Sequence, residues 1–190
     1  MFNLRSRAKR GAKRFLAARE GATAVEFSLI ALPFFALLFG TLELGMYFMA
    51  STTIDTAAMN SARKIRTGQM QTGGSNNAAS FKSDVCSNMS WLSSSDCTAN
   101  LQVDVRTFST FSGITVTPPT TAGAIDPAKL QYNAGASCDI VLVRVFYPYT
   151  LVAPTLEPGM ADLGATKKLI TSAVAFRNEN WGGGSACGAP

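Results

Sequence analysis

The stretch that decides the fold is residues 22–50, which read ATAVEFSLIALPFFALLFGTLELGMYFMA. Between Phe27 and Leu42 it contains no charged residue. As a helix it would be roughly 43 Å long at about 1.5 Å per residue, which exceeds the bilayer hydrocarbon core of about 30 Å. Because apolar residues surround the helix instead of forming one stripe, the stretch predicts a transmembrane helix rather than a helix buried in a soluble core.

The positive charge of the chain lies before this helix. Residues 1–21 hold seven of the 17 Lys and Arg residues and one of the 12 acidic residues, whereas residues 22–190 hold ten basic and eleven acidic residues. Basic residues that flank a transmembrane helix stay in the cytoplasm. We therefore expect residues 1–21 to be a cytoplasmic leader, and the part after the helix to be periplasmic in a bacterium. A nucleic-acid partner is not expected.

Glu26 is the unusual residue of the apolar helix, because a central carboxylate costs about 2.5–3.5 kcal/mol on insertion scales. One explanation is an interfacial glutamate that reaches the polar headgroups. Another is cleavage between Gly21 and Ala22, which would make Glu26 the fifth residue of the mature chain. The new ammonium of one subunit could then pair with Glu26 of a neighbour. Pro33 predicts a kink, which is either a local irregularity or a flexible point used when the helix leaves lipid for a bundle.

A resemblance rests on these residues. The run Gly21–Phe27, GATAVEF, resembles the prepilin peptidase site of type IVb and tight-adherence (Tad) pilins, and residues 14–67 resemble the TadE-like family of Tad pilus assembly proteins. The closing run AVAFRNENW is similar to the C-terminal strand of that family, except that Asn180 stands where the family favours proline.

The resemblance implies a minor pilin or pseudopilin that helps pilus assembly, adhesion and biofilm formation. Its partners would be a prepilin peptidase, the major and minor pilins of the system and the inner membrane. Cleavage would fall between Gly21 and Ala22, and assembly contacts would involve Glu26 and Phe27. The competing hypothesis is an uncleaved, single-pass membrane anchor that carries a periplasmic binding or scaffold domain of an envelope or secretion complex.

Residues 51–67 predict an amphipathic extension of the apolar helix. Apolar residues recur at steps of three and four, at Ile54, Ala58, Ala62 and Ile65. We expect this stripe to pack on the protein's own sheet. Glu43 lies about 26 Å from Glu26 along a helix, which favours an interfacial position at the outer side of the membrane.

The remaining chain, residues 68–190, predicts an exported domain. Its first residues, 68–80, have the composition of a flexible linker. Residues 101–106 alternate between apolar and polar, residues 140–147 form an apolar run that Pro148 should end, and residues 168–177 predict a third strand. One long helix followed by three strands predicts an α+β fold, with a small antiparallel sheet packed on the helix.

The four cysteines are expected to form disulfides if the domain is exported. Three pairings are possible. We favour Cys86 with Cys97, which closes a short loop, and Cys138 with Cys187, which holds the glycine-rich C-terminal tail. Free thiols are the alternative.

The sequence does not predict an enzyme. It has no histidine, which removes the commonest general base and metal ligand, and no recognised catalytic motif. We expect no catalytic residue, metal site, cofactor or small-molecule substrate.

Overall fold

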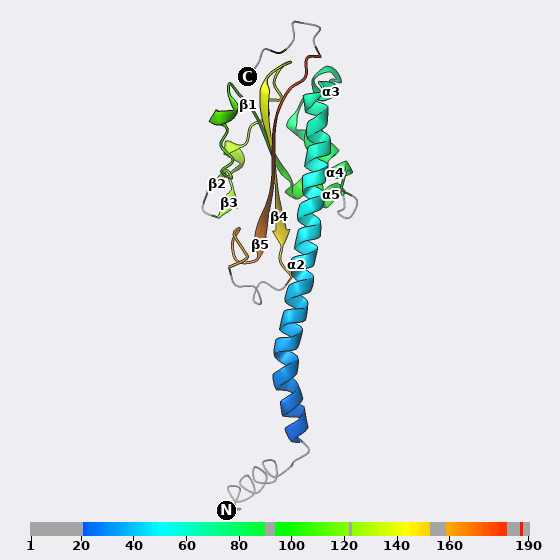
Figure 1. The fold of residues 1–190 in the computed structure, drawn as a ribbon, viewed down its shortest axis with the longest axis vertical. Helices are drawn as coiled ribbons and strands as arrows, with labels where there is room; N and C mark the ends of the chain where they lie inside the picture. Colours follow the sequence, from blue (N-terminus) through cyan, green and yellow to red (C-terminus); the bar gives the residue numbers. More distant parts are fainter. Residues whose placement is uncertain (1–20, 90–93, 122, 153–158, 182–186, 188–190) are drawn as a thin grey trace, which may run out of the picture. The chain divides into compact units, whose positions relative to one another are not determined.

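Helix α2 (Ala22–Arg66) is the longest element of the protein. The computed structural model describes residues 21–89, 94–121, 123–152, 159–181 and 187 (Figure 1). The chain divides into two units, Met1–Leu42 and Glu43–Pro190, and α2 contributes to both.

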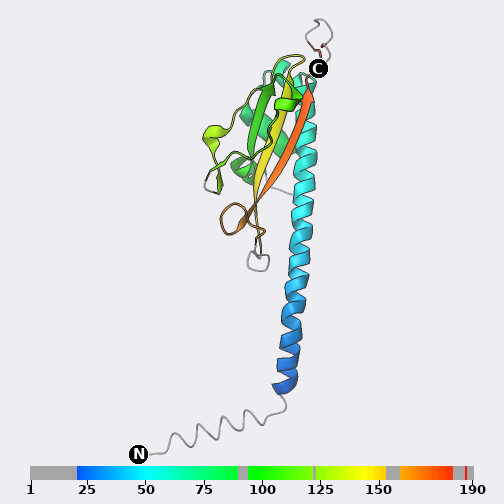
Figure 2. The same cartoon turned by 60° about the vertical axis from the view of Figure 1, so that its left-hand side comes forward.

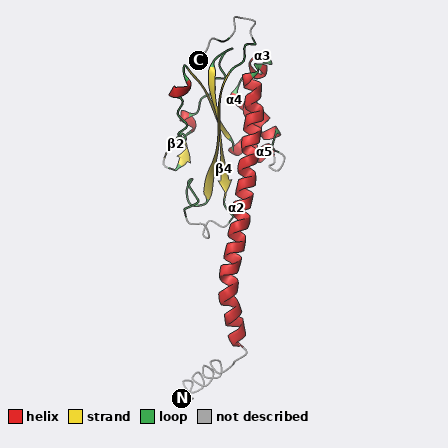
Figure 3. Ribbon diagram, viewed as in Figure 1, coloured by secondary structure: helices red, strands yellow, loops and turns green. Residues whose placement is uncertain are grey.

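The second unit contains a three-stranded antiparallel sheet. Its strands β1 (Gln102–Phe108), β4 (Ile140–Thr150) and β5 (Lys167–Arg177) lie in the order β1-β4-β5 (Figure 3). The fold is therefore α+β, as predicted, and the apolar run 140–147 forms the central strand. This run is apolar at nearly every position because both of its faces are covered, and all of its residues are buried.

One face of the sheet packs on helices. The odd-numbered residues of β4, including Val141, Val143 and Val145, share a core cluster with α2 and with helix α4 (Ala78–Ser87). The residues of α2 that reach this core follow the helical repeat; they are Ala50, Ile54, Ala57, Ala58, Ala62 and Ile65. The predicted stripe and its role against the sheet are thus confirmed. Burial of one isoleucine of this kind contributes about 1.5–3 kcal/mol.

The other face of the sheet packs on a loop-rich layer. This layer contains two 3₁₀ turns, η2 (Phe111–Gly113) and η3 (Pro127–Lys129), and the short strands β2 (Thr120–Thr121) and β3 (Ala124–Ile125). Figure 2 shows it on the side of the sheet that faces away from α2.

Two sequence expectations are wrong, and the first concerns residues 68–80. They contain helix α3 (Gln69–Thr72) and the start of α4, not a flexible linker. Gly68 adopts φ 78°, which ends α2 and starts α3, and Met70 is buried in the core. Composition alone does not predict helix α3, because this short helix is held against the domain by the burial of one methionine.

The second concerns Pro148, which does not end β4. The strand continues to Thr150 and pairs Pro148 with Leu169. The Leu151 N–H donates to the Thr166 carbonyl, so odd-numbered residues of β4 direct their N–H groups toward β5 and even-numbered ones direct them away. At Pro148 the side facing away has no β1 partner, because β1 pairs only as far as Phe146. The missing N–H therefore costs no ladder hydrogen bond.

Candidate functional site

The start of α2 carries the residues for which processing and assembly roles are predicted. The helix begins at Ala22, directly after Gly21, and Gly21 is exposed, with open space where a side chain would stand. Residues 1–20 lie outside the described part of the chain. Glu26 is exposed one turn after Ala22, and the Phe27 side chain is 70% exposed. The peptide bond between Gly21 and Ala22 is thus adjacent to an accessible helix end.

Glu26 lies one helical turn after Ala22. Four residues of α-helix correspond to about 6 Å, so Ala22 and Glu26 lie on the same face, one turn apart. A carboxylate in the first turns of a helix also interacts favourably with the positive end of the helix dipole. Glu26 can therefore accept an ammonium group from this helix end or from that of a neighbouring chain.

The surface around this end is apolar on every side. Large side chains from Val25 to Leu42 are exposed, and Leu32 and Leu37 reach 75% and 74%. Among the described residues one helix, Thr23–Arg66, is long and apolar enough to cross a membrane. Pro33 lies inside it and has no N–H to donate to the Leu29 carbonyl. Such a surface is compatible with lipid or with other apolar helices, but not with water.

Glu43 does not occupy the exposed interfacial position that the sequence favours. Its side chain is 2% exposed, and its Oε1 accepts a hydrogen bond of 2.5 Å from the Val152 N–H. The nearby Tyr149 ring packs edge-on against Tyr47, 5.9 Å between centroids. Burial, and then the charge of Glu43, raise the pKa of Tyr149 above its ordinary value. The burial of Glu43 could have been predicted from its spacing, since Glu43 is in register with Ala50 and Ile54 on the buried stripe.

Four aspartates of the domain hold parts of its backbone in place. Asp104 is fully buried and accepts hydrogen bonds from Arg144 Nη2 at 2.7 Å and Arg106 Nε at 2.9 Å, as well as from the Gln131 N–H. Arg144 also donates to the Thr117 carbonyl, which holds the loop layer against the sheet. Asp126 and Asp139 accept backbone N–H groups of nearby turns, and Asp162 accepts the N–H of Leu169 in β5.

The run after β5 is held by hydrogen bonds to other parts of the unit, and we call it the C-terminal latch (Asn178, Glu179 and Trp181). Asn178 is buried and donates to the Ala134 and Ala136 carbonyls. The Glu179 N–H donates to the Arg66 carbonyl at the end of α2, and its carboxylate pairs with Arg66 at 3.2 Å.

The Trp181 ring completes the latch against the turn after α2. It lies so close to Gly68 that a Cβ there would collide with it. The latch thus joins the end of α2 to the end of β5.

Two disulfides hold the second unit together. Cys86 in α4 is bonded to Cys97 in helix α5 (Ser94–Asn100), and Cys138 is bonded to Cys187. These are the pairs favoured from the sequence. The first joins two adjacent helices, and the second fixes a C-terminal residue to the loop before β4.

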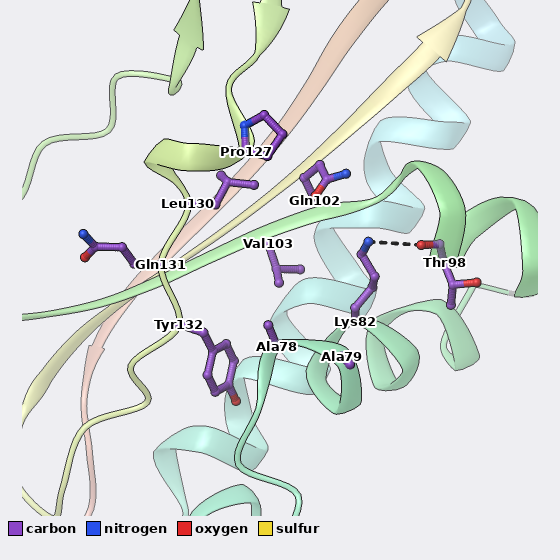
Figure 4. A pocket seen from close by; sticks show the side chains of 10 residues that line it. All are labelled: Ala78, Ala79, Lys82, Thr98, Gln102, Val103, Pro127, Leu130, Gln131 and Tyr132. Carbon is purple, nitrogen blue, oxygen red and sulfur yellow. Dashed lines mark hydrogen bonds between the residues drawn. The ribbon is translucent and has the colours of Figure 1, made fainter.

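A hollow with a volume of about 650 Å³ lies at the edge of β1 (Figure 4). Its walls include Val103, Leu130 and the ring of Tyr132. Lys82 donates to the Thr98 carbonyl, and burial lowers the Lys82 pKa. Burial raises the pKa of Tyr132 to about 12. No pair of groups here is arranged for acid–base or nucleophilic chemistry, and no group of acidic or cysteine residues within the described ranges could hold a metal ion.

Comparison with known proteins points to the helix. Residues 21–63 match the family model described as TadE-like protein. The matched segment begins at Gly21 and lies almost wholly within α2. No curated protein and no solved structure matches the chain. The chain is thus similar to TadE-like proteins over residues 21–63.

Proposed function

We propose, from the TadE-like domain at residues 21–63, that this protein is a minor pilin or pseudopilin of a Tad (type IVb) pilus. The observation that carries the proposal is the coincidence of three features at one place. The family match begins at Gly21, the helix begins at Ala22, and Glu26 is exposed one turn later. A prepilin peptidase would cut between Gly21 and Ala22, and the mature chain would contribute to pilus assembly, adhesion and biofilm formation.

Glu26 gives this assembly step a physical basis. Cleavage creates an ammonium at Ala22, and an unpaired charge of either sign is costly among apolar helices. When helices pack with an axial offset, the ammonium of one chain and the Glu26 carboxylate of the next neutralise each other. The exposed apolar side chains from Val25 to Leu42 supply the packing surface. Phe27, beside Glu26, would exclude water from the pair.

The topology proposed for the chain follows from its charges. The seven basic residues among residues 1–21 would keep the leader in the cytoplasm, and residues 22–50 would span the inner membrane. Residues 51–190 would then lie in the periplasm or on the pilus. The two disulfides support this location, because disulfides persist in oxidising compartments.

The mature N-terminus tests the processing step. The full-length gene is expressed in its host, and in a strain without the prepilin peptidase, and the membrane-extracted protein is analysed by mass spectrometry. We expect the host protein to begin at Ala22 and the control to retain residues 1–21. Gly21→Val should block cleavage in the host, because the proposed peptidase site has glycine at this position. The space around Gly21 is open, so the substitution should not disturb the fold of the chain itself. A host protein that retains residues 1–21 would instead support the uncleaved scaffold protein.

Glu26→Gln tests the pairing step, since it keeps the size of the side chain and removes its charge. Cleavage should continue, while the amount of this protein in fibres sheared from cells, and the number of fibres, should fall. Ser28→Ala is the matched control, because the Ser28 hydroxyl only donates to the Val25 carbonyl of its own helix. Normal fibres in the Glu26→Gln strain would refute the pairing role.

A further inference from the structure

The outer edge of β5 is open over its central part. The Asn178 N–H donates to the Asp139 carbonyl, and the Thr166 carbonyl accepts from the Leu151 N–H. Even-numbered residues of β5 therefore direct their backbone groups toward β4, and odd-numbered ones direct them outward. Thr171, Ala173 and Ala175 each present an N–H and a C=O at this edge, and all three residues are exposed. No hydrogen-bond partner for these groups occurs in the described ranges.

At the two ends of this edge, unlike in its centre, backbone groups have hydrogen-bond partners. Near the start of β5, Asp162 Oδ1 accepts the Leu169 N–H at 2.6 Å. Beyond its end, the Glu179 N–H donates to the Arg66 carbonyl. Between these points, residues 169–176 contain no charge, proline or glycine. Natural proteins usually protect an exposed strand edge by such residues or by a covering segment, because an open edge pairs readily with another strand.

A groove runs beside the open edge on the helix side. It has a volume of about 330 Å³, with Met59, Arg63 and Arg66 of α2 on one wall and residues 174–176 of β5 on the other. Met59 is 57% exposed. A strand added to β5 would direct alternate side chains toward this groove, as happens when a peptide extends a sheet.

The charges around the edge identify the kind of strand that would fit. Lys167 lies at one end and Arg63 near the other, and neither forms an ion pair within the described part of the chain. A second copy of β5 would bring cations against cations in either direction. Antiparallel pairing would place Arg63 near the partner's Lys167, and parallel pairing would place each cation near its own equivalent. The edge therefore favours a different protein whose strand is apolar in the middle and acidic at its ends.

We propose that the edge of β5 from Thr171 to Ala175 is a docking site for an extended segment of another protein, with apolar side chains in its centre and acidic residues flanking them. The segment would pair with the outward backbone groups of β5 and place apolar side chains beside Met59. Its acidic residues would meet Arg63 and Lys167. This site does not depend on cleavage of the leader, so its test is independent of the processing experiment.

The test uses full-length protein in detergent and a fluorescent seven-residue peptide, with glutamate at both ends and alternating valine and threonine between them. We expect saturable binding, and slower hydrogen exchange at the amides of Thr171, Ala173 and Ala175. A peptide with lysine at both ends should bind at least about tenfold more weakly, as should a peptide that is N-methylated at alternate residues. Equal binding of the N-methylated peptide would overturn the proposal, because strand pairing requires those N–H groups.

Variants of the chain locate the site. Ala173→Pro removes an outward N–H without removing a bond to β4, and it should reduce peptide affinity about tenfold or more. Arg63→Gln should weaken binding of the glutamate peptide, whereas Lys129→Gln, an exposed cation in the loop layer, should not. Unchanged affinity in folded Ala173→Pro, or protection at β1 instead of β5, would refute the site. Concentration-dependent protection of β5 without peptide would show that a second copy occupies it. If Ala173→Pro does not fold, the N-methylated peptide still decides the question on the unaltered chain.

Discussion

The two halves of helix α2 share one backbone conformation but carry opposite surfaces. Before Glu43 the large apolar side chains are exposed around the whole helix; Phe27 is 70% and Leu32 75% exposed. After Glu43 one face of the helix is buried, with Ile54 and Ile65 at 0% exposure, while apolar residues on its other face, such as Met59 at 57%, stay exposed. The comparison shows that the spacing of apolar residues along a helix indicates what surrounds the helix, since both halves have the same backbone conformation. An all-round apolar surface requires lipid or other helices, whereas a stripe is matched by one sheet.

The largest expected effect comes from trimming one isoleucine in each half. Ile54→Ala should lower the free energy of unfolding of the second unit by about 2–5 kcal/mol, because it leaves a cavity in the core. Ile30→Ala should change it by less than about 0.5 kcal/mol, because Ile30 is 70% exposed. Urea unfolding of the full chain in detergent, followed by near-ultraviolet circular dichroism, measures both. Equal losses would show that the first half also packs within the chain.

A lysine substitution in each half tests whether the exposed side chains of that half face lipid or water. Leu32→Lys should hinder membrane insertion by about 2.5–3.5 kcal/mol, because the ammonium would lie near the centre of the span. Met59→Lys should leave insertion and stability nearly unchanged, although Met59 is also exposed, at 57%. Carbonate extraction of membranes measures insertion of the two variants. Equal insertion of Leu32→Lys and the unaltered chain would contradict a lipid-facing first half.

The two glutamates of α2 form a third comparison. Glu43→Gln should destabilise the second unit by about 1–3 kcal/mol, because a buried carboxylate that accepts the Val152 N–H is replaced by an uncharged amide. Glu26→Gln should leave thermal stability unchanged, because Glu26 is exposed. Differential scanning calorimetry of the two variants distinguishes a glutamate that stabilises the fold from one that does not. A loss of stability only in Glu26→Gln would reverse the assignment.

The smallest expected effect is a dependence on alkaline pH. The pKa of Tyr149 is raised in the folded protein, so its contribution to stability is complete below its ordinary pKa and is lost as the pH rises through the folded value. We expect a loss below about 1 kcal/mol, since the side chain is only partly buried. In Glu43→Gln the tyrosine should titrate at lower pH, because one cause of the shift is removed. Ultraviolet difference titration against a Tyr149→Phe control measures the pKa of Tyr149. An unchanged pKa in Glu43→Gln would show that the charge of Glu43 does not raise it.

Much of this architecture could be predicted from the sequence because it depends on local periodicity. The apolar run of α2, the stripe from Ile54 to Ile65 and the alternation in β1 each appear within a few residues of chain. The TadE-like resemblance of residues 14–67 also depends on a local pattern, and the family match at residues 21–63 agrees with it.

What could not be predicted depends on partners far along the chain. The N–H that binds Glu43 belongs to Val152, 109 residues later. Pro148 is tolerated because β1 ends before it, a fact of register that no local pattern contains. The short helix α3 depends on the burial of Met70 in the core, which composition does not predict. Each case reflects tertiary packing that overrides local preference.

Because of the C-terminal latch, the second unit should resist force in one direction better than in another. The Arg66 carbonyl is held by Glu179, and Trp181 covers Gly68, so α2 is joined to β5 at its end as well as along its stripe. Tension along α2 therefore loads the stripe and the latch simultaneously, as in shear, and many contacts must fail together. A force applied across the helix would instead open the contacts one turn at a time. The contacts of the second unit are therefore arranged to resist a pull along its own helix.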